Sequence, residues 1–131
     1  MVDYVGMQMH LNQWSGVREG VVDTNTILEQ INYYQILGVP VLFTEVTYEP
    51  TASELQMNAE EFNTRLASIF EQVVRVAIQS GNVKGITFWG VTDKYIKDIN
   101  WYQIFDENGQ PKQAYYVVLR TSMKLLCYIQ L

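Results

Sequence analysis

Three short apolar segments alternate along the chain with longer segments in which apolar residues recur at helical spacing. We expect strands over residues 4–11, 39–46 and 83–90. The middle strand contains an unbroken apolar run, residues 41–43, which is typical of a parallel strand covered on both faces. Strands that alternate with helices predict an α/β fold with a parallel sheet and crossover helices.

Signals for three helices lie between and after these strands. Thr26 followed by Glu29 forms a capping box for the first helix, and Gly38 ends it. The second helix stops at residues 80–82, and the third is expected to start at Pro111, whose missing N–H costs nothing in a first turn. The residues expected to face inward are Ile27, Ile31, Tyr34, Phe62, Leu66, Ile69, Val73, Val76, Ala77, Tyr115, Val118 and Leu119.

The length of the chain limits what these elements can form. Three strand–helix units in 131 residues are too few for a closed (β/α)8 barrel, which typically takes about 250 residues. We therefore expect residues 1–131 to be one part of such a barrel. Because an open parallel sheet presents unpaired edges, another segment or another chain should cover them. Two copies with three strands each would not supply the eight of a simple closed dimer.

Composition and charge narrow the range of ligands. The net charge is −5 and the nine Lys and Arg are scattered, so a neutral ligand such as a sugar is favoured over nucleic acid. His10 is the only histidine and Cys127 the only cysteine, so neither a disulfide framework nor a Cys/His zinc site can form within the chain, and no cofactor or metal is expected. Residues 1–14 lack a signal-peptide pattern, so export is not expected to be encoded here. The apolar residues 123–131 are too few for the roughly 20 that span a bilayer, so a membrane anchor is not expected either. The cellular compartment stays open.

The residues that close the predicted strands are the candidates for chemistry, because ligands bind at the carboxyl ends of parallel strands. Glu45 follows an apolar run, where an ionised group is costly to bury unless it is paired or used. It is therefore either a catalytic carboxylate or an ion-paired or capping residue. By itself, His10 fits a structural or a catalytic histidine, and Trp89 fits barrel packing or a flat apolar face for a sugar ring.

Blocks of sequence at the same strand ends resemble a known family. They are residues 6–10 (GMQMH), 43–46 (FTEV) and 86–95 (ITFWGVTDKY), followed by residues 104–116 before the last helix. In sequence and spacing they resemble the sixth, seventh and eighth strands and the run into the last helix of glycoside hydrolase family 10, the retaining endo-β-1,4-xylanases. The resemblance covers nearly the whole chain and implies the carboxyl-terminal part, about three strand–helix units, of a (β/α)8 barrel that acts on xylan or xylo-oligosaccharides.

The resemblance also implies a role for each side chain. Glu45 lies at the position of the catalytic nucleophile, and Gln8 and His10 lie where they would hydrogen-bond and orient it. Trp89 lies at the sugar subsite beside the cleaved bond. A retaining glycosidase needs a second carboxylate about 5 to 5.5 Å away. In the family that acid/base glutamate ends the fourth strand, upstream of this chain, so we expect the missing amino-terminal half of the barrel or another chain to supply it.

Two positions depart from the family's pattern. The family usually has an aspartate where this chain has Thr47, which removes a negative partner for His10, and a second tryptophan where this chain has Lys97. We hypothesise that Trp101, from the same loop, replaces that tryptophan beside the sugar. Trp89, Trp101 and Lys97 are therefore the candidate substrate-binding residues. Family members are typically secreted. The departures leave open a second interpretation, in which the chain is a carbohydrate-binding or structural remnant of the barrel without catalysis. A third interpretation is an unrelated α/β domain, and it would be favoured by strands that are not adjacent and parallel.

Overall fold

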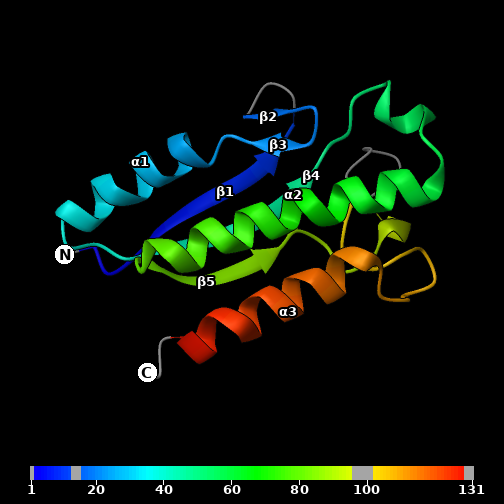
Figure 1. The fold of residues 1–131 in the computed structure, drawn as a ribbon. Coiled ribbons are helices and arrows are strands. Elements are labelled where there is room, and N and C mark those ends of the chain that lie inside the picture. Colours follow the sequence, from blue (N-terminus) through cyan, green and yellow to red (C-terminus); the bar gives the residue numbers. More distant parts are fainter. Residues whose placement is uncertain (1, 13–15, 96–101, 129–131) are drawn as a thin grey trace.

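The computed structural model describes residues 2–12, 16–95 and 102–128, and its main elements alternate between strand and helix (Figure 1). A small hairpin lies between the first strand and the first helix, and a 3-10 turn follows each of the other two long strands. The elements are β1 (Val5–Leu11), β2 (Val17–Arg18), β3 (Val21–Val22), α1 (Thr24–Ile36), β4 (Val41–Tyr48), η1 (Glu54–Gln56), α2 (Ala59–Ser80), β5 (Val83–Phe88), η2 (Asp93–Tyr95) and α3 (Gln113–Tyr128).

The three long strands form one parallel sheet in the order β1-β4-β5. The predicted parallel sheet with β4 as its interior strand is therefore confirmed. The three helices lie together on one face of the sheet (Figure 1). The opposite face is open on β1, where Gly6 and Gln8 are exposed. Polar side chains of β1 can therefore reach solvent on the face that the helices leave free.

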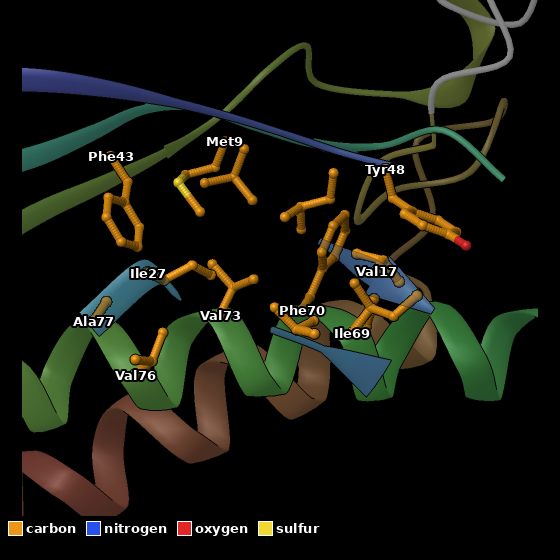
Figure 2. Close-up of a cluster of buried hydrophobic side chains, with 14 of the residues drawn as sticks. Met9, Val17, Ile27, Phe43, Tyr48, Ile69, Phe70, Val73, Val76 and Ala77 are labelled. Atoms are coloured by element: carbon orange, nitrogen blue, oxygen red, sulfur yellow. The ribbon is translucent and has the colours of Figure 1, made fainter. Parts of the chain in front are cut away.

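The hydrophobic core packs between the sheet and α2 (Figure 2). Met9 and Phe43 point from the strands toward Phe70 and Val73 of α2, and the last three are 0% exposed. Burying such a side chain contributes about 1.5 to 3 kcal/mol, so this layer is what holds α2 to the sheet. The apolar stripe predicted for α2 is confirmed, with Phe62 partly buried at its start and Leu66, Ile69, Val73, Val76 and Ala77 buried.

The start of α1 differs from the prediction, because Asp23 rather than Thr26 caps it. The carboxylate of Asp23 accepts hydrogen bonds from the Thr26 backbone N–H at 3.1 Å and from its hydroxyl at 2.9 Å. Thr26 therefore uses its side chain to bind the cap and lies inside the first turn. Aspartate and threonine are both favoured caps, and the helix begins one turn earlier than expected, at Thr24.

The helix α3 also starts later than expected, and the residues that it buries differ in part from those predicted. It begins at Gln113, because Pro111 belongs to a bridge with Phe105 in the preceding turn. The prediction that Leu119 faces inward is wrong, since this residue is 45% exposed, while Tyr115 and Val118 are partly buried. The helix packs against α2 (Figure 1), and its buried residues include Ala114, Val117 and Thr121. In the part of the chain that the structure describes, no helix is both long and apolar enough to cross a membrane.

Candidate active site

The carboxyl ends of β1 and β4 bring together the three residues that the sequence singled out. Gln8 Nε2 donates to Glu45 Oε1 at 3.1 Å, and His10 Nε2 lies 2.8 Å from Glu45 Oε2. The side chains of His10 and Glu45 are 29% and 23% exposed. A carboxylate bound at both oxygens by two groups from the neighbouring strand cannot rotate without losing a hydrogen bond, and it remains open to a ligand from the solvent side.

A β-bulge in β4 places Glu45 in this position. Phe43 pairs with Met7 on β1, but the next residue of β1, Gln8, pairs with Glu45, so Thr44 is left without a partner in the register. The register of β4 against β5 shifts over the same stretch. Bulges re-aim side chains and are over-represented next to active sites.

The bulge lets two consecutive side chains of β4 occupy the open face of the sheet. Thr44 lies over Gly6, where an added Cβ would be 3.0 Å from the Thr44 methyl carbon. Glu45 reaches Gln8, which is exposed on the same face of β1 as Gly6. In a regular strand one of two neighbouring residues would point into the core. The sequence pattern of β4 gave no signal of this irregularity.

Trp89 lies directly after β5 and close to His10, which binds the same carboxylate. Its ring centroid is 6.3 Å from that of His10, with an angle of 44° between the ring planes. Its backbone N–H donates to Val46 O at 2.9 Å, and its side chain is 41% exposed. The next residue, Gly90, has a φ of +78°, a conformation that favours glycine and turns the chain out of the strand. The indole therefore offers an exposed apolar face beside Glu45.

Lys97 and Trp101, the other two candidates for sugar binding, lie outside the described residues. Their predicted roles therefore remain predictions. Among the described residues, no group of three or more His, Cys, Asp or Glu side chains could hold a metal ion.

Thr47 has a partner that sequence reasoning did not identify. Its side chain is buried, and its hydroxyl accepts a hydrogen bond from Gln103 Nε2 at 2.8 Å. The backbone N–H of Gln103 donates to Asp93 Oδ1 at 2.8 Å. The position where the family usually has an aspartate is thus tied to the segment before α3. The sequence signal for this contact was weak: an amide side chain, Gln103, between the apolar neighbours Tyr102 and Ile104.

A buried ion pair anchors this segment from the other side. Lys112 Nζ lies 2.7 Å from Asp93 Oδ2, and the two side chains are only 8% and 13% exposed. Burial lowers the pKa of Lys112 from its usual value, although the neighbouring Asp93 carboxylate acts in the opposite direction. Both residues are part of the sequence blocks that resemble the family, but their pairing depends on the folded chain.

A second buried network holds the end of β4. Glu54 is 3% exposed and accepts hydrogen bonds from Tyr48 Oη at 2.6 Å, from the Thr51 N–H at 2.8 Å and hydroxyl at 2.9 Å, and from Arg65 Nη1 at 3.1 Å. Burial alone would raise the pKa of Glu54, but these hydrogen bonds outweigh it and hold the pKa below its usual value. Burial, together with the Glu54 carboxylate, raises the pKa of Tyr48. The carboxylate thus clamps the loop after β4 to α2.

The family model described as glycosyl hydrolase family 10 matches residues 1–121 of the 131. The chain belongs to glycosyl hydrolase family 10. Among curated family members, the endo-1,4-beta-xylanase 2 of Aureobasidium pullulans is 31% identical over 135 residues, which cover 92% of this chain and 35% of that protein. The endo-1,4-beta-xylanase A of Caldicellulosiruptor saccharolyticus is 28% identical over 133 residues, which cover 91% and 37%. This family 10 chain therefore spans about a third of the length of the curated relatives it matches.

Solved structures show the same relation for the fold. The xylanase 10B of Thermotoga petrophila, solved in complex with xylobiose, is similar to this chain with a TM-score of 0.75 at 24% identity. The matched region covers 94% of this chain and 37% of the Thermotoga chain. A xylanase of family 10 from Thermobacillus composti has a TM-score of 0.70 at 28% identity, covering 88% and 41%. The predicted fold, a few strand–helix units of the family's (β/α)8 barrel, is therefore confirmed.

Proposed function

We propose that this family 10 chain forms the nucleophile side of the active site of a retaining β-glycosidase that acts on xylan or xylo-oligosaccharides. The observation that carries the proposal is the Glu45 carboxylate, which Gln8 and His10 hold at both oxygens. A nucleophile needs a fixed direction of attack, and two donors from a neighbouring strand supply it. The substrate class is supported by relatives named endo-1,4-beta-xylanases and by the xylobiose complex of a structurally similar protein.

The proposed reaction proceeds in two steps. First, a Glu45 oxygen forms a bond to the anomeric carbon while the bond from that carbon to the leaving oxygen breaks and a general acid protonates that oxygen. Second, water attacks the same carbon, a general base takes the proton from the water, and Glu45 leaves as a carboxylate. The exposed face of Trp89 fits the apolar side of the sugar bound next to this carboxylate. The second carboxylate is proposed to come from the part of the barrel outside this chain.

We propose that a complementary barrel segment covers the open sheet. Within the described residues, β1 and β5 are the outer strands, and each pairs only with β4 along its length. Beside β5, a hollow of about 400 Å³ between α2 and α3 is lined mostly by apolar side chains, among them Val83, Ile86 and Phe88. Unpaired edges and uncovered apolar surface promote association. Relatives about three times as long have enough additional chain for the remaining strands and helices.

The proposed function is tested with dinitrophenyl β-xylobioside, whose leaving group departs without protonation. The chain is combined with a complementary barrel segment in which the acid/base glutamate is replaced by alanine. Because this replacement also removes the base that activates water, a xylobiosyl ester should accumulate on Glu45, and mass spectrometry of the peptide that contains Glu45 would show the added sugar. The Glu45→Gln variant should remain unlabelled. A folded assembly that acquires no label on Glu45 would refute the nucleophile assignment.

The second candidate is a carbohydrate-binding remnant of the barrel, and one observation favours it. Thr47 stands where the family usually has an aspartate, and its neutral hydroxyl accepts a hydrogen bond from Gln103. The negative partner that an aspartate would give His10 is therefore missing at this position. In that case, the assembly with an intact acid/base glutamate would bind xylotriose in calorimetry but would not hydrolyse either the activated or the natural substrate.

A further inference from the structure

Gln103 is a fully buried polar residue whose burial is costly. It is 0% exposed, and its Oε1 atom has no hydrogen-bond partner among the described residues. Buried polar atoms without partners are rare, because the hydrogen bonds lost to water are not replaced. A leucine of similar size would avoid that cost. The amide is therefore better explained by what its other end, Nε2, holds in place than by a contribution to stability.

Gln103 joins the ends of β4 and β5 where the regular pairing of these strands stops. The last register pair is Val46 with Phe88, and the Trp89 N–H still donates to Val46 O. Beyond that point, the Gln103 side chain binds Thr47 on the β4 side, and its backbone N–H binds Asp93 on the β5 side. Gln103 thus connects the two strand ends beyond their last pair, next to the backbone bond from the Tyr102 N–H to Tyr48 O at 2.8 Å.

The β5 side of this bridge is firmly supported. Asp93 is bonded to the buried Lys112 through Oδ2, and its own N–H donates to Phe105 O at 3.2 Å. The backbone N–H of Lys112 donates to Ile104 O at 2.9 Å, next to Gln103. Groups held by several partners of this kind keep a fixed geometry, which a binding site needs.

We propose that Gln103 is a positioning residue that fixes the Trp89 ring relative to the Glu45 carboxylate, and that it thereby sets how tightly the site binds xylo-oligosaccharides. Thr47 lies two residues after Glu45, and Asp93 lies four residues after Trp89. The bonds of Gln103 to Thr47 and Asp93 therefore link the segment that carries Glu45 to the segment that carries Trp89. This inference rests on the proposed function for its ligand. The donors to Glu45, Gln8 and His10, are on β1 and do not depend on these bonds. Gln103 therefore affects sugar binding and not the attack of the carboxylate.

The test compares Gln103→Leu with a matched control in the chain assembled with its complementary segment. Gln113→Leu is the control, because it also removes an amide that is bonded to a threonine, Thr64, but at an exposed position. For Gln103→Leu we expect a dissociation constant for xylotriose about tenfold higher in calorimetry, since small displacements of binding groups weaken recognition strongly. Hydrogen exchange of the amides in residues 89–93 should accelerate. The unfolding midpoint should change little, because the unpartnered Gln103 Oε1 is removed while the buried Thr47 hydroxyl loses its donor. Gln113→Leu should alter none of these.

Catalytic measurements separate positioning from a general loss of structure. The assembly is measured with an aryl xylobioside and with a complementary segment that keeps its acid/base glutamate. Gln103→Leu should raise KM and leave the dependence of kcat on pH unchanged at low pH, because the hydrogen bonds to Glu45 are unchanged. Thr47→Val should reproduce the weaker binding, and the double variant should add nothing further, since both substitutions remove the same hydrogen bond.

The possible results discriminate between the two proposals. Unchanged exchange in residues 89–93, or unchanged xylotriose affinity while the unsubstituted assembly binds xylotriose, overturns the positioning role. A lower unfolding midpoint with unchanged affinity also overturns it and assigns Gln103 to stability. If the unsubstituted assembly binds no xylo-oligosaccharide, the proposed function fails and the role in sugar binding fails with it. Faster exchange in Gln103→Leu would then still show that the bridge holds the strand ends together.

Discussion

Removal of the Glu54 carboxylate should destabilise the protein more than any change at an exposed ion pair. In Glu54→Ala, Tyr48 Oη, the Thr51 N–H and the Thr51 hydroxyl lose their shared acceptor, and Arg65 loses its ion pair. The side chains of Glu54 and Arg65 are 4% and 28% exposed, so the arginine can recover hydrogen bonds to water whereas the buried hydroxyl of Tyr48 cannot easily do so.

The magnitude follows from the groups left without partners. A buried donor that loses its partner costs about 1 to 3 kcal/mol, which applies in full to the Tyr48 hydroxyl and in part to the two part-buried donors of Thr51. Breaking a fully buried ion pair costs about 3 to 5 kcal/mol, a range that must be reduced because Arg65 is partly exposed. We therefore expect Glu54→Ala to lower the free energy of unfolding by about 3 kcal/mol, or the unfolding midpoint by roughly 10 °C. Glu54→Gln, which keeps the shape and one acceptor oxygen, should lose about half as much.

Urea unfolding of the full chain, followed by circular dichroism, measures these differences. The control is Glu71→Ala, which removes an exposed pair with Arg75 on α2 and should cost no more than about 0.5 kcal/mol. Because the pKa of Glu54 is held below its usual value of 4.5, its stabilising effect is complete above that pH and is lost as pH falls through the lowered pKa. The deficit of Glu54→Gln relative to the unsubstituted chain should therefore shrink in acid. A loss in Glu54→Ala no larger than that of Glu71→Ala, or a deficit independent of pH, would refute this reasoning.

Two further predictions concern the fold. Phe70→Ala should cost about 3 to 5 kcal/mol in urea unfolding because Phe70 is 0% exposed beneath the sheet, whereas Ile36→Ala, at a position 85% exposed, should cost little; equal losses would contradict the described core. Asp23→Ala should lower the unfolding midpoint and Asp23→Ser should largely restore it, because serine also caps helices; if thermal unfolding shows no difference between the two variants, Asp23 is not the cap of α1.

The sequence predicted the parts of this fold that depend on local periodicity. The strand β4 and the stripe of α2 follow from runs of apolar residues, and burial of those residues decides where the elements pack. Among the site residues, Gln8, His10 and Glu45 could be brought together because the carboxyl ends of parallel strands share one edge of a sheet.

The parts that the sequence did not predict depend on contacts between distant residues or on close alternatives. The bond between Thr47 and Gln103 spans 56 residues and involves a buried amide that no periodic pattern marks. Asp23 and Thr26 are both good capping residues, and only the path of the chain out of β3 decides which one caps the helix. Leu119 has the spacing of a buried residue, but the close approach of α3 to α2 leaves it at the surface.

The bulge at Thr44 has a consequence for how this chain can evolve. The number of residues between the start of β4 and Glu45 sets the side of the sheet on which the carboxylate emerges, because successive side chains of a strand alternate between faces. If β4 retained Thr44 as a regularly paired residue instead of a bulge, the carboxylate would turn into the apolar layer that contains Phe70, and the protein would lose its candidate nucleophile without any change in the identity of Glu45. Loss of Thr44 itself would leave Glu45 opposite Gln8 on the open face. In related sequences, an insertion between Phe43 and Glu45 should therefore be tolerated less well than loss of the bulged residue.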